Sequence, residues 1–163
     1  MTRGDWIRIA LVLHVIGAIM GLGTNLTYGL ITSVGERAGG ERRVFALRLI
    51  QTLDRRLANP AYMAQLVTGL LLVWLLKLNL FATSWLLLGL VLYITVAVLG
   101  ITVYAPVLRR QTALAGELAS ESDEGAVSAE YGAVARRSRQ LGIVATALVV
   151  VIVTLMVTKP ALW

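Results

Sequence analysis

Long apolar runs separated by polar segments form the main pattern along this chain. Four runs are long enough to cross a bilayer, which takes about 20 apolar residues in a helix. They cover residues 6–34, 61–78, 83–108 and 140–158. The first and third exceed the required length, so these helices are expected to tilt or to extend beyond the lipid. No small-residue cleavage site follows a short apolar core near the start, so the first run is expected to be retained.

The segments that join the runs are amphipathic rather than plain loops. Residues 41–58 carry apolar side chains at every third or fourth position with arginines between them, namely Val44, Leu47, Ile50, Leu53 and Leu57. Such a helix either lies in the membrane interface, with its arginines toward anionic headgroups, or packs on the end of the helix bundle. The second connection, 109–139, is expected to contain an exposed turn at residues 120–125. The pattern predicts a single all-α integral membrane domain: a four-transmembrane-helix bundle with two amphipathic cytoplasmic connections.

Composition and charge agree with a membrane location. Hydrophobic residues make up 58% of the 163 residues and charged residues only 15%, against about a half and a quarter in soluble domains. Of the 15 lysines and arginines, six lie in residues 35–59 and five in 109–139. Basic residues concentrate on the cytoplasmic side, which predicts both termini outside a bacterial plasma membrane. The tryptophans support this orientation, because they fall near the predicted outer ends: Trp6, Trp74, Trp85 and Trp163.

The residue types exclude several function classes. The chain contains no cysteine, so thiolate metal sites and cysteine nucleophiles are ruled out. No Asp or Glu falls inside a predicted span, whereas proton-coupled cation transporters usually need one there. One histidine cannot supply a metal site or a hydrolytic triad without further partners. The arginines flank apolar runs instead of covering a soluble module, so nucleic acid is not an expected partner.

The only histidine, His14, lies inside the first span on a face of small and polar residues. Gly17 and Gly21 share that face at helical spacing, and two glycines four residues apart let another helix or a flat ligand approach closely. Tyr93 of the third span and Gly69 of the second are expected at a similar depth. These five residues form the candidate binding site.

Two interpretations of this site remain open. His14 is either a hydrogen-bonding group that holds the helices in register, or a ligand in a binding site for haem b or another lipophile. A haem needs one axial imidazole, a slot lined by small residues and apolar walls. Two further polar residues of the second span, Gln65 and Thr68, are expected nearer the inner side, against Asn25 and Thr146.

The motifs LHVIGAIMGLG (13–23), NPAYMAQLVTGLLL (59–72) and LMVTKP (155–160) resemble an uncharacterised family of four-span bacterial membrane proteins. More distantly, the chain resembles the HemJ-type membrane protoporphyrinogen oxidases. This second resemblance implies that His14 matches a histidine implicated in haem binding. It also matches Pro60 and Gly69 to a Pro and a Gly of span two, and Lys159 with Pro160 to a terminal Lys-Pro.

The chain departs from the HemJ-type pattern in its third span. That pattern has a lysine and a further histidine there, whereas residues 86–100 read LLLGLVLYITVAVLG. The sequence therefore favours a protein without that oxidase activity. Two functions remain: a haem- or lipophile-binding membrane protein, or a non-catalytic accessory subunit that packs against a larger membrane complex. Either would contact the lipid bilayer, and the small-residue faces favour a homo-oligomer or a larger complex.

Overall fold

In a computed structural model that describes residues 2–120 and 125–161, the chain is all-helical in these residues. The first and last helices are α1 (Arg3–Ala38) and α6 (Gly125–Thr158). Between them run α2 (Gly40–Leu53), η1 (Asp54–Ala58), α3 (Asn59–Leu76), α4 (Ser84–Leu99), η2 (Gly100–Tyr104) and α5 (Ala105–Ser120). The single π-helical turns η1 and η2 leave the helix unbroken, so α2 continues into α3 and α4 into α5. The result is four long helical rods, as the apolar runs predicted.

Local sequence signals explain where the rods begin and turn. Thr2 and Asp5 form a reciprocal capping box at the start of α1. The reversal into α2 uses Gly39 and Gly40 at φ of 65° and 46°, a region that side chains other than glycine rarely adopt. Lys77 ends α3 in the left-handed region, and the side chain of Asn79 accepts backbone hydrogen bonds in the loop that follows.

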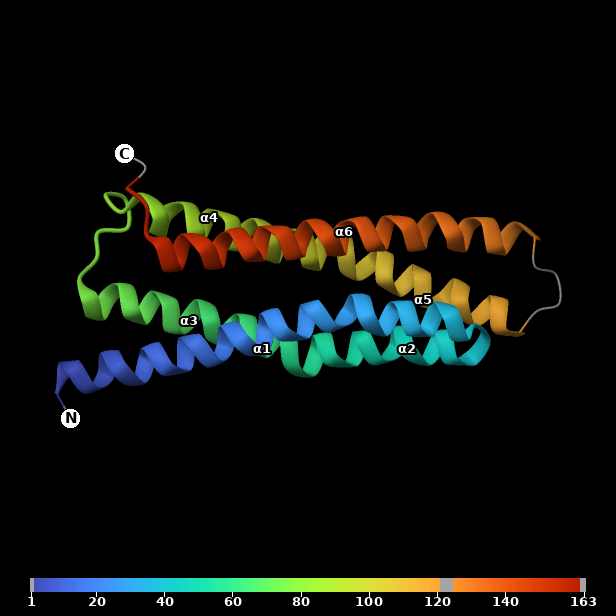
Figure 1. Cartoon of the computed structure of the whole chain (residues 1–163), viewed down its shortest axis with the longest axis horizontal. Coiled ribbons are helices and arrows are strands. Elements are labelled where there is room, and N and C mark those ends of the chain that lie inside the picture. Colours follow the sequence, from blue (N-terminus) through green and yellow to red (C-terminus); the bar gives the residue numbers. More distant parts are fainter. Residues whose placement is uncertain (1, 121–124, 162–163) are drawn as a thin grey trace.

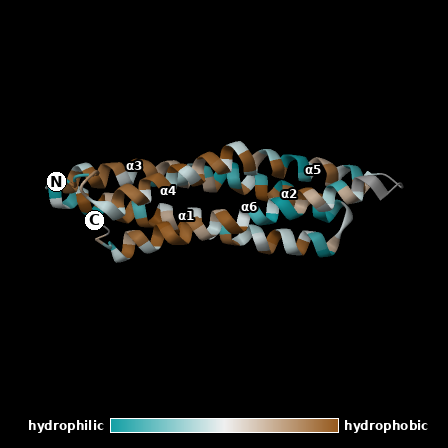
Figure 2. Ribbon diagram, turned by 90° about the horizontal axis from the view of Figure 1, so that it is seen from above, coloured by the Kyte–Doolittle hydropathy of each residue, from teal (hydrophilic) through white to brown (hydrophobic). Residues whose placement is uncertain are grey.

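Each rod is longer than a membrane is thick. A helix of 36 residues such as α1 extends about 54 Å, whereas the hydrocarbon core measures about 30 Å. The start of α1, the end of α6 and the α3–α4 loop lie at one end of the molecule, the terminal end. The α1–α2 turn, the end of α5 and the start of α6 lie at the other, the polar end (Figure 1). Apolar residues dominate the terminal end and polar residues the other (Figure 2). The rods therefore cross the membrane near the terminal end and extend beyond it at the polar end.

The predicted amphipathic segments form the walls of this extension. The helix α2 packs along α1 and α5, and α5 packs along α6, so both segments stand in line with the spans that they continue. Of the two arrangements open for residues 41–58, the structure has the one packed on the bundle end. The turn predicted at 120–125 falls mostly outside the described residues, as does Trp163.

The best-packed core of the molecule lies in the polar half. It gathers apolar side chains and two tyrosines from α1, α2, α5 and α6, namely Tyr28, Val44, Leu47, Ile50, Leu108, Leu114, Ala115 and Tyr131. In the apolar half most large side chains point outward; Ile19 is 67% exposed and Val157 76%. The residues most shielded from solvent are thus at the end that leaves the membrane.

In the apolar half the four rods form two separate pairs. There α1 packs on α3, and α4 packs on α6. Within the described residues, no Cα atom of α3 comes within 8 Å of one in α4 or α6. The two pairs lie apart toward the terminal end and approach each other toward the polar end (Figure 1).

Candidate functional site

The imidazole of His14 is held between α1 and α3 by two side chains of α3. Its Nδ1 lies 3.0 Å from the Thr68 hydroxyl, and its Nε2 lies 3.0 Å from the Gln65 amide nitrogen. The Thr68 hydroxyl itself donates to the Ala64 carbonyl at 2.7 Å, so it accepts a hydrogen bond from Nδ1–H. The Gln65 amide donates to the lone pair on Nε2. This network assigns a neutral ring with its proton on Nδ1.

Two glycines make the close approach around this ring possible. A Cβ added at Gly69 would stand 3.1 Å from His14 Cε1, and one added at Gly17 would stand 2.8 Å from the Gln65 side-chain oxygen. That oxygen is buried and has no hydrogen-bond partner in the described chain. Gly17 presents a Cα–H toward it, a weak donor that partly compensates a carbonyl oxygen in an apolar environment.

One helical turn farther along α1, Gly21 makes room for the aromatic ring of Tyr62. A Cβ at Gly21 would come within 2.7 Å of that ring, and the Tyr62 hydroxyl donates to the Gly21 carbonyl at 3.1 Å. Four of the five predicted site residues therefore line one seam between α1 and α3: His14, Gly17, Gly21 and Gly69.

The fifth predicted residue, Tyr93, lies on the other helix pair. Its hydroxyl donates to the backbone carbonyl of Tyr62 at 2.6 Å, and the described chain shows no hydrogen bond between Tyr93 and His14. Because α3 and α4 have no backbone contact here, this bond bridges the two pairs. The sequence predicts only a similar depth for Tyr93 and His14, whereas the hydrogen bond of Tyr93 is made to Tyr62, whose own hydroxyl bonds to Gly21.

The polar partners of His14 were not identified correctly from sequence. Gln65 and Thr68 were expected to meet Asn25 and Thr146, but both contact His14. Their spacing of three residues places them on one helix face, and that signal was available. The pairing of faces between α1 and α3 was not, because it depends on how far the two helices slide along each other.

As packed, this seam does not fit a haem. Both ring nitrogens of His14 accept or donate a hydrogen bond, so neither has a free lone pair directed at an iron atom. The space beside the glycines, where a flat macrocycle would need to enter, holds the side chains of Gln65 and Tyr62. Axial ligation through Nε2 would require the Gln65 amide to leave this nitrogen.

A second polar cluster, absent from the sequence predictions, joins all four rods at the polar end. Glu36 of α1 accepts a hydrogen bond from the Tyr131 hydroxyl of α6 and pairs with Arg43 of α2 at 3.1 Å. The Arg43 guanidinium also lies over the Tyr131 ring, 4.9 Å from its centre, and Gln111 of α5 donates to the Tyr131 hydroxyl. Burial, and then Glu36, raise the pKa of Tyr131, so the phenol stays protonated and remains a donor.

These observations define a multi-span, all-helical integral membrane protein. The chain belongs to the family described as predicted integral membrane protein (DUF2269), whose model matches residues 8–160. No curated protein matches the chain, and no solved structure matches it. The family supports the membrane location and the several spans, while the HemJ resemblance stays a prediction.

Proposed function

We propose that this protein is a non-catalytic accessory subunit of a membrane assembly, bound to its partner through the apolar face of α6. The observation that carries the proposal is the exposure of that helix. In its most apolar stretch no residue is buried, although α6 runs beside α4. A four-helix bundle that is complete in itself would cover one side of each span.

The exposed face of α6 has the spacing of a helix-packing seam. Exposed residues follow one another at intervals of four and three, in the order Ile143, Ala147, Val150, Thr154 and Val157. A repeat of 3.5 residues keeps one stripe facing a neighbouring helix, and Ala147 and Thr154 are of the small residue types enriched where helices pack in lipid. These features support a protein partner on α6 more than random contact with acyl chains.

The polar groups near His14 also favour a structural role over chemistry. The ring is engaged on both nitrogens by α3, so its function in this proposal is to fix α1 and α3 as a rigid pair. We place the arginine-rich polar end in the cytoplasm of a bacterial cell, because six of the 15 basic residues lie in 35–59 and five in 109–139.

Site-specific photocrosslinking in native membranes tests the proposal. A photoreactive residue at Val150 or Val157 should give a covalent adduct with another polypeptide. The same residue at Ile19, an equally apolar position on α1 that is 67% exposed, should give mainly lipid adducts. The proposal fails if the α6 positions also yield only lipid adducts and the protein migrates on native gels as an isolated monomer.

A further inference from the structure

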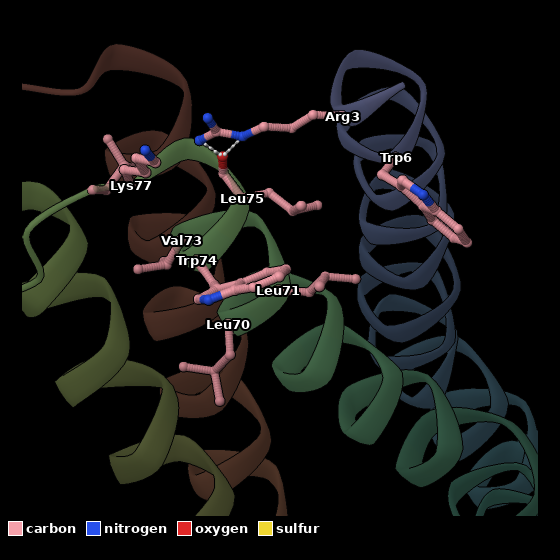
Figure 3. A pocket seen from close by; sticks show the side chains of 9 residues that line it. Arg3, Trp6, Leu70, Leu71, Val73, Trp74, Leu75 and Lys77 are labelled. Carbon is pink, nitrogen blue, oxygen red and sulfur yellow. Dashed lines mark hydrogen bonds between the residues drawn. The ribbon is translucent and has the colours of Figure 1, made fainter. Parts of the chain in front are cut away.

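An amphipathic groove opens at the terminal end, between the first turns of α1 and the last turns of α3. It has a volume of about 960 Å³. Apolar side chains make up most of its lining: Trp6, Leu70, Leu71, Val73, Trp74, Leu75 and Leu78. The two charged residues that line it, Arg3 and Lys77, are both basic. They lie at the helix ends, with Leu70, Leu71 and Trp74 deeper along α3 (Figure 3).

Arg3 is held at the mouth of the groove by the end of α3. Its Nε donates to the Leu75 carbonyl at 2.9 Å, and one terminal nitrogen donates to the same oxygen. This covers a carbonyl at the negative end of the helix, which would otherwise repel an anion. The other terminal nitrogen makes no hydrogen bond within residues 2–120 and 125–161, so part of the guanidinium fork remains free to donate.

No acidic side chain of the described chain forms an ion pair with the two cations at the mouth of the groove, Arg3 and Lys77. Asp5, the nearest acidic residue in sequence, is bound to the Thr2 backbone at 2.8 Å and pairs with Arg8 at 3.9 Å. Lys77 is exposed and forms no ion pair in the described chain. A ligand in this groove would thus meet two cations above an apolar wall.

We propose that the groove binds an anionic glycerophospholipid. Its phosphate would lie between Arg3 and Lys77, and one acyl chain would follow Leu71 and Trp74 toward the membrane centre. The two basic residues lie at the helix ends and the apolar residues lie deeper along α3, which is the order of headgroup and acyl chain in a lipid. Basic residues attract anionic lipids, and the indole rings of the tryptophans favour the headgroup level. The site differs from the His14 seam and from the α6 face, so it goes beyond the proposed function.

Competition between lipids on the purified full-length protein tests the proposal. Native mass spectrometry in mild detergent, with equal amounts of phosphatidylglycerol and phosphatidylcholine, should show a preference for phosphatidylglycerol. The Lys77→Gln variant should lower that preference about five-fold, the contribution expected for one basic residue near an anionic lipid. Arg8→Gln is the matched control: it removes the same charge from an exposed residue that does not line the groove, and the preference should stay unchanged.

A second variant separates the groove from simple surface charge. Leu71→Trp places a large ring on the apolar wall and should weaken binding of both lipids while Arg3 still covers the end of α3. The proposal is overturned if the wild-type protein shows no lipid preference, or if Arg8→Gln acts as strongly as Lys77→Gln. It is also overturned if Leu71→Trp leaves lipid binding unchanged, because the bound lipid would then not contact the apolar wall of the groove.

Discussion

At the scale of single residues, the polar side chains inside the apolar half serve helix pairing. His14 donates to Thr68 and accepts from Gln65, so a side chain that is costly in lipid is satisfied by a neighbouring helix. The direction of His14, toward the bundle interior, was predictable from the small residues on its face. Its partners were not, because a helical wheel gives the direction of a side chain but not the level of the residue opposite.

Replacing His14 with Ala should therefore destabilise the α1–α3 pair and change nothing in the visible spectrum. Interhelical hydrogen bonds in membranes contribute about 0.6 kcal/mol each on average, so the loss should be about 1 kcal/mol. Denaturant unfolding in detergent micelles measures it, and Thr95→Ala is the control. Among the described residues, the Thr95 hydroxyl bonds only to the Val91 carbonyl of its own helix, so little change is expected there. A Soret band in the wild-type protein that disappears in His14→Ala would contradict this role and support haem binding.

Gly21 and Gly23 provide a matched pair that tests the seam. A Cβ at Gly21 would come within 2.7 Å of the Tyr62 ring, whereas a Cβ at Gly23 would meet no described atom within 4 Å apart from the adjacent backbone of α1. Gly21→Ala should lower the free energy of unfolding by about 1–3 kcal/mol, the usual cost of overpacking. Gly23→Ala should be neutral or stabilising by up to about 1 kcal/mol, because alanine favours the helix. Equal effects in the same unfolding assay would show that α3 does not pack on Gly21.

At the scale of elements, apolar length predicted the four spans, but it did not predict where each helix ends. Most of the apolar run at 61–78 becomes the second half of a rod that begins at Gly40 and ends at Leu76, because η1 joins α2 to α3 without a break. Arginines lower the hydropathy of 41–58 without lowering its helix propensity. Sequence alone therefore left an interfacial helix and an upright one equally open, and packing against α1 and α5 decides between them.

Cysteine labelling of α2 can verify its upright position. The chain has no native cysteine, so a single Phe45→Cys substitution gives one reactive thiol at a site 68% exposed. If α2 stands beyond the membrane, a membrane-impermeant maleimide applied to the polar end should label this thiol rapidly. Val67→Cys, 61% exposed on α3 within the apolar run, should stay unlabelled because lipid surrounds it. Protection of Phe45→Cys comparable to that of Val67→Cys would place α2 in the interface instead.

At the scale of the whole molecule, the two helix pairs are held together mainly outside the membrane. The core around Leu47 and Ile50 and the Glu36–Arg43–Tyr131 cluster join all four rods at the polar end. In the apolar half, the hydrogen bond that links the two pairs within the described residues is the one from the Tyr93 hydroxyl to the Tyr62 carbonyl. The two pairs pack together at the polar end because burial of apolar surface drives association in water. In the apolar half this driving force is missing, because lipid is as apolar as the side chains.

Two isoleucine substitutions should therefore have very different effects. Ile50 is fully buried at the polar end, and Ile19 is 67% exposed in the apolar half. Ile50→Ala removes the same atoms as Ile19→Ala but leaves a cavity in the core at the polar end, outside the membrane. This cavity should lower the free energy of unfolding by about 2–5 kcal/mol. Ile19→Ala exchanges one lipid contact for another and should cost less than about 0.5 kcal/mol. Spin labels on α3 and α4 should also show a broader distance distribution in Ile50→Ala, because the polar core no longer fixes the two pairs. If Ile19→Ala proves as destabilising as Ile50→Ala, a partner covers α1 in the membrane, and the bundle does not depend on its polar end for stability.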